Sequence, residues 1–334
     1  MVRAVGRGRV VAYGIAKPPR RPASLIGSLF TRSVRRMLGS FHGAGKLVPA
    51  LYNLRSPRRC APAMPELPEV ETTARGIAPH LIGARATGAS VRQPRLRQTV
   101  PADLAAQLCG QVLHAVSRRA KYLLLSFDTG QVLIHLGMSG SLRIVATDTP
   151  AQRHDHVDLH FGARTLRLRD PRRFGMVLWL DAGAPPPSML AQLGIEPLSP
   201  DFDGPWLHRA TRCRRTPIKL FLMDSRQVVG VGNIYASESL FRARIHPQTP
   251  AGRLGPQRCA RLAQAVRETL SEAIAAGGST LRDFVGSDGR PGYFQQHYFV
   301  YGRTSAPCRH CGSPIQRQIM AQRATFFCPR CQRR

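Results

Sequence analysis

The chain has 334 residues, and 43% of them are apolar, which allows two folded domains and excludes a disordered protein. The 49 Lys and Arg residues outnumber the 19 Asp and Glu residues and give a net charge of +30, which favours a polyanion such as nucleic acid as the partner. No apolar run approaches the ~18 residues of a membrane span, so no membrane partner is expected.

The first 63 residues form a basic extension that precedes the predicted fold. They hold 13 Lys and Arg and no acid. The rest of the chain keeps 36 basic and 19 acidic residues, a net charge of +17, so the preference for a polyanion does not depend on the extension. A segment without acids is typical of an organellar transit peptide, and the alternative is an upstream region read from a start codon placed too early. We favour the second interpretation and exclude 1–64 from the active protein.

From Met64 the sequence predicts a helix followed by short strands. Val70, Ala74, Ile77 and Leu81 share one face of a helix that begins near Met64. Strand-like runs follow at 121–127, 131–136, 141–145, 156–161, 165–169 and 176–180. Six short strands separated by Gly, Asp and Pro turns predict a β-sandwich or barrel rather than β-α-β units.

After this region the pattern changes from strands to helices. A Pro-rich stretch at 183–205 is typical of an interdomain linker. Helical periodicity then appears at 218–223, around 234–243 and at 257–276, and the chain is strand-like from about 293. We therefore predict a β-sandwich or barrel domain at 65–182, a linker at 183–205, a helical domain at 206–296 and a strand-like end at 297–334.

Four cysteines near the end of the chain predict a metal site. They form two C-x2-C pairs separated by sixteen residues: Cys308, Cys311, Cys328 and Cys331. Two such pairs on a hairpin supply four thiolates in a tetrahedron, which is typical of one structural Zn²⁺ with no open catalytic position. We see no secretory signal, so a disulfide framework is not expected. Arg317 and Arg323 lie on the hairpin, and we favour nucleic-acid contact over an ordinary solvated hairpin for them.

Eight segments together resemble one family, the formamidopyrimidine-DNA glycosylases. They are PELPEVE at 65–71, RRAKYLLL at 118–125, HLGMSGSLR at 135–143, HDHVDL at 154–159, DPRRFG at 170–175, VVGVGNIYASESLF at 228–241, SDGRPGYFQQ at 287–296 and QRATFFC at 322–328. The resemblance implies an α+β fold: an N-terminal β-sandwich with flanking helices, then a helical helix–two-turn–helix domain and a zinc-finger hairpin. It also implies base-excision repair of oxidised purines, namely formamidopyrimidines and 8-oxoguanine opposite cytosine.

The resemblance assigns catalytic roles to four residues. The amine of an N-terminal proline, here Pro65, attacks C1′ and forms a Schiff base, which then permits β,δ-elimination and nicking of the strand. Glu66 is the general acid for the opening sugar, with Glu69 as an electrostatic support. Lys121 transfers a proton in β-elimination and Arg323 assists δ-elimination. An α-amine has a pKa near ~8, so a usable fraction is neutral at working pH. The active chain must therefore begin at Pro65.

The resemblance also predicts how DNA is held. His154, Arg214, Lys219 and Asn233 match positions that contact phosphate, which positions the protein without reading sequence. Met138, Arg172 and Phe174 match residues that fill the space left by a flipped nucleotide, although core packing would otherwise explain the Met and the Phe. The segment 287–296 resembles a lid over the flipped base. The predicted partner is double-stranded DNA that contains oxidised purines or abasic sites.

Two other functions stay open from the sequence. Endonuclease VIII shares the nucleophile but removes oxidised pyrimidines. Separately, Arg282 stands where some relatives carry lysine, which puts lesion preference in question. A non-catalytic zinc-ribbon nucleic-acid binder would explain the charge and the cysteines, but not the Pro65–Glu66 pair. We expect a monomer in the bacterial cytoplasm, associated with the nucleoid, or an organellar protein if the extension is a transit peptide.

Overall fold

The computed structural model describes residues 64–278 and 297–334. The expectations for the extension at 1–63, for Arg282 and for the lid at 287–296 lie outside the described residues. Within the described ranges, no helix is both long enough and apolar enough to cross a membrane.

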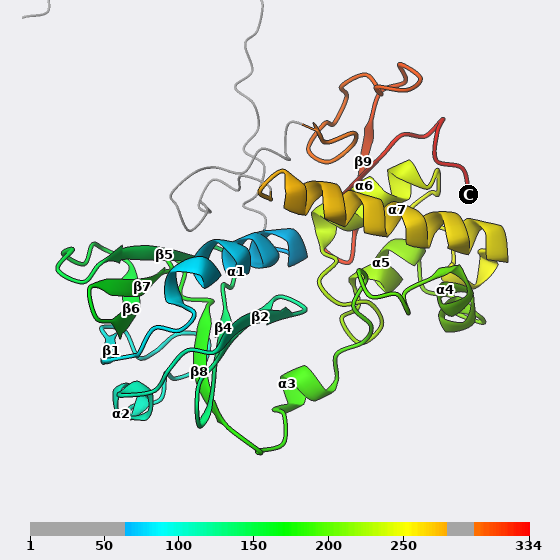
Figure 1. Ribbon diagram of the computed structural model, residues 1–334. Helices are drawn as coiled ribbons and strands as arrows, with labels where there is room; N and C mark the ends of the chain where they lie inside the picture. The colour runs from blue at the N-terminus through cyan, green and yellow to red at the C-terminus, as the bar shows by residue number, and fades with distance from the viewer. Residues whose placement is uncertain (1–63, 279–296) are drawn as a thin grey trace, which may run out of the picture. The chain divides into compact units, whose positions relative to one another are not determined.

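The N-terminal half is a β-sandwich with a helix packed against it (Figure 1). One four-stranded antiparallel sheet has the order β1 (Gly88–Val91), β6 (Asp155–Phe161), β7 (Arg164–Arg169), β5 (Ser141–Ala146). The other has the order β2 (Ala115–Arg119), β3 (Tyr122–Ser126), β4 (Gly130–His135), β8 (Met176–Asp181). The helices of this half are α1 (Leu67–Leu81) and the short α2 (Leu104–Leu108).

Alternating apolar residues build the core of the sandwich. Val70, Ile77 and Leu81 of α1 pack with inward-facing residues such as Leu123 and Leu166 from the two sheets, and all are buried. Burial of a large aliphatic side chain contributes about 1.5–3 kcal/mol, so the apolar face of α1 is held firmly on the sandwich. The predicted α+β class and N-terminal sandwich are confirmed.

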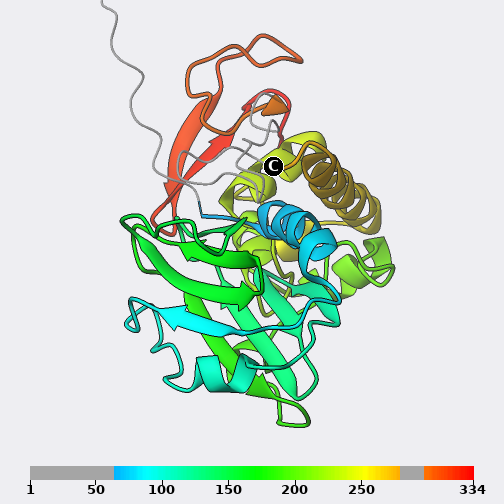
Figure 2. The same ribbon diagram turned by 60° about the vertical axis from the view of Figure 1, so that its left-hand side comes forward.

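The second half is helical and ends in a two-stranded hairpin (Figure 2). Its helices are α3 (Ser188–Ala191), α4 (Gly204–Thr211), α5 (Ile218–Met223), α6 (Asn233–Arg242), a 3-10 turn (Ala251–Arg253) and α7 (Pro256–Ala275). The hairpin consists of the antiparallel strands β9 (Gln316–Met320) and β10 (Arg323–Phe327). Leu67, at the start of α1, belongs to the core of this half, so α1 contributes to both cores.

The linker predicted at 183–205 has structure of its own. It contains α3 and the first residues of α4. Within it, Gly194 N donates to Ser225 O at 2.8 Å, Ile195 N donates to Gln227 O at 3.0 Å, and Val229 N donates to Ile195 O at 3.0 Å. These hydrogen bonds surround one parallel β-bridge between Ile195 and Val228, and they hold residues 194–196 against the segment that leads into α6.

Candidate active site

The carboxylate of Glu66 lies at the N-terminus of α6. It accepts hydrogen bonds from Gly232 N at 2.7 Å and Ile234 N at 3.0 Å. The unpaired amides of a helix N-terminus favour such an acceptor. A side chain at position 232 would conflict with this contact, because a Cβ there would lie 2.2 Å from Glu66 Cδ. Glycine is therefore required at position 232, the second glycine of the GVGN turn, because the Glu66 side chain lies so close to its backbone.

Burial controls the protonation of Glu66. It raises the pKa of this carboxyl above the ordinary value, while the positive charge of Lys121 opposes the shift. Glu69 is also buried; its Oε2 accepts from Glu66 N at 2.9 Å and its Oε1 accepts from the Tyr235 hydroxyl at 2.6 Å. A buried carboxyl with a raised pKa, held in place at both its backbone and its side chain, can act as a general acid.

Lys121 lies in the tight turn between β2 and β3. Ala120, which precedes it, has a φ of +54°, the left-handed region that few residues other than glycine adopt. Burial lowers the pKa of Lys121, the charge of Glu66 raises it, and the charge of Arg323 lowers it. Glu66 and Arg323 therefore both lie close enough to Lys121 to shift its pKa, although 257 positions separate Glu66 from Arg323 in the sequence.

A pocket of about 430 Å³ joins these elements. Its lining includes Lys121, His135, Gly232 and Arg323, and also Met64, the residue that precedes buried Pro65. Arg323 begins β10, directly after the hairpin turn at 321–322, and is exposed. The structure thus brings three of the four predicted catalytic residues to one pocket or its immediate border, with Pro65 beside it.

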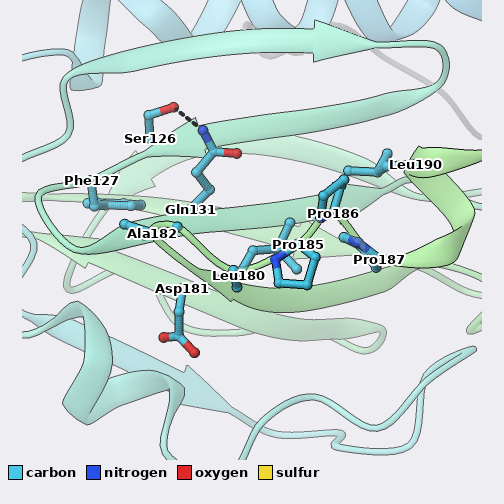
Figure 3. Close-up of a pocket in the computed structure, with 13 residues that line it drawn as sticks. Ser126, Phe127, Gln131, Leu180, Asp181, Ala182, Pro185, Pro186, Pro187 and Leu190 are labelled. Atoms are coloured by element: carbon cyan, nitrogen blue, oxygen red, sulfur yellow. Dashed lines mark hydrogen bonds between the residues drawn. The ribbon is translucent and has the colours of Figure 1, made fainter.

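A second pocket, of about 400 Å³, lies beneath the Pro-rich segment that follows β8 (Figure 3). Gln131 and Ser126 line it, and Gln131 Nε2 donates to Ser126 Oγ at 3.0 Å. Among the described residues, none of the catalytic or DNA-contact residues predicted from the sequence lines this pocket. We therefore place the candidate chemistry in the Lys121 pocket alone.

Lys219 and Asn233 both contact the strand that carries Arg323. The buried ammonium of Lys219 donates to Asn233 Oδ1 at 2.6 Å and to Thr325 Oγ1 at 2.7 Å, and Asn233 Nδ2 donates to Ala324 O at 3.0 Å. Burial lowers the pKa of Lys219 to about 7. These contacts fix the start of β10 against α5 and α6. The phosphate contacts assigned to Lys219 and Asn233 stay predictions.

The three residues predicted to fill the void come from two adjacent loops. Buried Asp170 joins the loops: its carboxylate accepts from Ser139 Oγ at 2.7 Å and from Gly175 N at 2.7 Å. Met138 lies in the first loop, and in the second the Arg172 guanidinium lies 5.0 Å from the centre of the Phe174 ring. Phe174 is 44% exposed, so core packing does not explain it.

His154 and Arg214 lie outside the lining of the Lys121 pocket. His154 precedes β6 with a φ of +77°, and its carbonyl accepts from Asp170 N at 2.9 Å. Arg214 is exposed after α4. Their phosphate contacts stay predictions.

The four predicted zinc ligands converge. Their sulfur atoms all lie within 4.8 Å of one another, with Cys308 and Cys331 at 3.9 Å and Cys311 and Cys328 at 3.5 Å. Zn–S bonds of ~2.3 Å require S–S separations of ~3.8 Å in a tetrahedron, so this donor set fits zinc. His310 N donates to Cys308 Sγ and Cys331 N donates to Cys328 Sγ, both at 3.4 Å, which orients the thiolates. The site lies in a small apolar cluster with Phe241 and Phe326.

Replacing one ligand is expected to loosen the hairpin. Cys308→Ser should lower zinc affinity at least about tenfold and weaken DNA binding, because zinc supplies folding energy to a segment with a small core. The sandwich should stay folded, since its core is separate. Zinc content by mass spectrometry and DNA affinity by titration check this, with Cys213→Ser, an exposed cysteine outside the cluster, as the control. Unchanged zinc content and affinity in Cys308→Ser would contradict the assignment.

Three family models match this chain. They are the formamidopyrimidine-DNA glycosylase N-terminal domain at 64–177, the formamidopyrimidine-DNA glycosylase H2TH domain at 193–285 and a zinc finger found in FPG and IleRS at 306–334. A formamidopyrimidine-DNA glycosylase of Aromatoleum aromaticum is 66% identical over 271 residues, covering 81% of this chain and 100% of the relative. The chain belongs to the formamidopyrimidine-DNA glycosylase family.

Further glycosylases agree with this membership. The one from Thioalkalivibrio sulfidiphilus is 57% identical over 271 residues, covering 81% of this chain and 100% of the relative. The crystal structure of MutM (Fpg) from Thermus thermophilus matches with a TM-score of 0.73 and 40% identity, covering 80% of this chain and 98% of that one. Lactococcus lactis Fpg in complex with abasic-site DNA matches with a TM-score of 0.74 and 33% identity, covering 80% and 100%.

Membership settles the class of activity. This formamidopyrimidine-DNA glycosylase is a base-excision repair enzyme with AP lyase activity, a helix–two-turn–helix domain and one structural zinc. The prediction of a glycosylase is confirmed, and the non-catalytic zinc-ribbon alternative is not supported.

Proposed function

We propose that this glycosylase releases oxidised purines from duplex DNA through attack of the Pro65 nitrogen on C1′. The observation that carries the proposal is the position of the Glu66 carboxyl, which is buried beside Pro65 and held by the N-terminal amides of α6. Lys121 and Arg323 line the adjoining pocket. An amine, an acid and two further cations at one site match the needs of Schiff-base chemistry on a polyanion.

Each step has a residue suited to it. Pro65 N forms a bond to C1′ as the C1′–N9 bond breaks, and the base leaves with the bonding electron pair and takes up the proton that Pro65 N loses. Glu66, whose pKa is raised by burial, gives a proton to the ring oxygen as the C1′–O4′ bond opens, which leaves the iminium. The iminium that results makes the C2′ protons acidic. Lys121, whose pKa is lowered by burial, takes part in the proton transfer of β-elimination. Arg323 assists loss of the second phosphate and binds phosphate.

The choice of purine over pyrimidine rests on the PELPEVE segment and on half-buried Met138 with exposed Arg172 and Phe174. Lactococcus lactis Fpg was crystallised with Fapy-dG DNA, as a variant, and with oxidised-pyrimidine DNA, as the wild type. We infer that this chain prefers oxidised purines opposite cytosine, with Arg172 bonding to the orphaned cytosine. Competing cleavage of 8-oxoguanine and thymine glycol duplexes distinguishes the two preferences.

We further infer a monomer in the cytoplasm of a bacterium, acting at the nucleoid. The curated relatives are bacterial glycosylases that this chain covers over their whole length. We also infer that the working domains are 65–182, 206–296 and 297–334, joined by 183–205.

Borohydride trapping tests the nucleophile. Reduction of the iminium should link the enzyme covalently to 8-oxoguanine DNA, and peptide mapping should place the link on Pro65. Pro65→Gly should still give some trapped complex, because glycine at the chain start also offers an α-amine. A link mapped to an internal lysine such as Lys121 would refute the assignment.

A further inference from the structure

We infer that Glu196 is a positioning residue for Lys121 and that it couples the Lys121 turn to the turn that holds Glu66. This inference rests on the proposed role of Lys121 in strand cleavage. Glu196 was not singled out in the sequence, because it lies 75 positions from Lys121 in a Pro-rich stretch.

The carboxylate of Glu196 holds all three residues that precede Lys121. Its Oε1 accepts from Ala120 N at 2.7 Å and from Arg119 Nη1 at 2.9 Å, and its Oε2 accepts from Arg118 Nη1 at 2.9 Å. Arg118 Nη1 also donates to Ala120 O at 2.9 Å. Both polar groups of the Ala120 backbone are thus fixed, directly or through Arg118, at a residue held in the left-handed region.

The same ion pairs extend to α1 and to the backbone next to Glu196. Arg118 Nε donates to Glu71 Oε2 of α1 at 2.9 Å, and Arg119 Nη2 donates to Gly194 O at 2.6 Å. The Arg118 and Glu196 side chains are only 9% and 21% exposed. Charge-assisted hydrogen bonds that are largely shielded from water are stronger than surface ion pairs, so they can hold a short turn in one geometry.

Glu196 is itself anchored to the other catalytic turn. The backbone of Ile195, its neighbour, is hydrogen-bonded to Gln227 and Val229 at the parallel β-bridge. The chain continues from Val229 directly to Gly230, whose carbonyl accepts from Leu67 N at 3.1 Å. Two residues later, the amide of Gly232 donates to the Glu66 carboxylate. A path of hydrogen bonds and short backbone segments therefore connects the Lys121 turn, through the Glu196 carboxylate, to the Glu66 carboxylate.

The test separates positioning from general stability. In the form that begins at Pro65, Glu196→Gln should slow strand cleavage at a preformed abasic site about tenfold, because small misplacement of a reacting group has large rate effects. DNA affinity should change less than about twofold, since the carboxylate is paired with Arg118 and Arg119 and is largely shielded from solvent. In a Lys121→Ala background, Glu196→Gln should change cleavage less than about twofold, because the residue acts through Lys121.

Two variants complete the design. Glu272→Gln removes a more exposed carboxylate–arginine pair, with Arg242, away from the pocket, and should leave cleavage unchanged. Glu196→Asp keeps the charge with a shorter reach and should fall between wild type and Glu196→Gln, which keeps the test usable if Glu196→Gln folds poorly.

The outcomes distinguish the two claims. If Lys121→Ala leaves cleavage unchanged, the proposed role of Lys121 fails, and the positioning role fails with it. If Lys121→Ala slows cleavage but neither Glu196 variant does, only the Glu196 inference is overturned. Equal effects of Glu196→Gln with and without Lys121 would make Glu196 merely structural and would also overturn it.

Discussion

A chain that begins at Pro65 is expected to release 8-oxoguanine, and a chain that retains residue 64 and those before it is expected to be inactive by about a thousandfold or more. In the longer chain the Pro65 nitrogen is a tertiary amide with no basic lone pair, so it cannot attack C1′ at any pH. Position also matters, because Met64 lines the same pocket as Lys121 and Arg323, where the sugar must enter.

The measurement needs defined chain starts. The full 334-residue chain and the Pro65 form are expressed without N-terminal tags, each start is confirmed by mass spectrometry, and each is assayed on a duplex with one 8-oxoguanine opposite cytosine. The basic extension should increase nonspecific DNA affinity at low salt. Base release by the intact long chain at a rate near that of the Pro65 form would rule out the proline mechanism.

The second large effect is expected for Glu66→Gln, which should slow base excision about 10²-fold to 10⁴-fold. Glutamine has nearly the same shape but cannot give up a proton to the sugar, and its amide group cannot accept from both Gly232 N and Ile234 N. Single-turnover base release measures the loss. Glu268→Gln, on α7 in an outer ion pair, is the matched control and should behave as wild type.

The pH profile gives an independent check on Glu66. The acid form of Glu66 and the neutral form of the Pro65 amine are both required, so the rate of the wild-type enzyme relative to that of Glu66→Gln should fall as pH rises through the pKa of Glu66. Burial raises this pKa, so the fall in the ratio should begin above the ordinary carboxyl value of 4.5. Titration of the Pro65 amine, with a pKa near ~8, affects both enzymes and cancels in the ratio. A ratio that stays constant with pH over this range would show that another group is the acid.

The sequence predicted most of the fold because most strands carry apolar residues at alternate positions, as Val157, Leu159 and Phe161 do in β6. Strands β3 to β8 and helices α5 to α7 all lie within about two residues of the predicted ranges. The pattern did not reveal β1 or β2. Strand β2 is half-exposed and carries Ser117, Arg118 and Arg119, which break the apolar alternation. Arg118 and Arg119 pair with Glu71 and Glu196, which lie far from them in the sequence, so a local pattern does not reveal this pairing.

The candidate site divides in a similar way. Pro65, Glu66, Lys121 and Arg323 were predicted from motifs. Lys121 and Arg323 line one pocket, and Glu66 binds the amide of Gly232 in its lining, with Pro65 next to Glu66 in the chain. Asp170 and Glu196 were missed as organising residues, since each holds backbone and side-chain groups far away in the sequence. A buried acid beside a turn was the available signal for Asp170. The contacts of Lys219 with β10 were also not predicted, because they join residues 106 positions apart.

The contact between Glu66 and α6 has a consequence for how the enzyme is made. Glu66 and Gly232 are 166 positions apart, so a ribosome that has released the whole sandwich has still not made the amides that hold the acid. Leu67 likewise cannot be buried until α5 to α7 have been made, because they form the core that surrounds it. The strands can pair as they emerge, as domains generally do during synthesis, but the start of α1 cannot dock. A truncated or stalled chain can therefore have a folded sandwich but no assembled acid, and activity that depends on Glu66 is gained only near the end of translation.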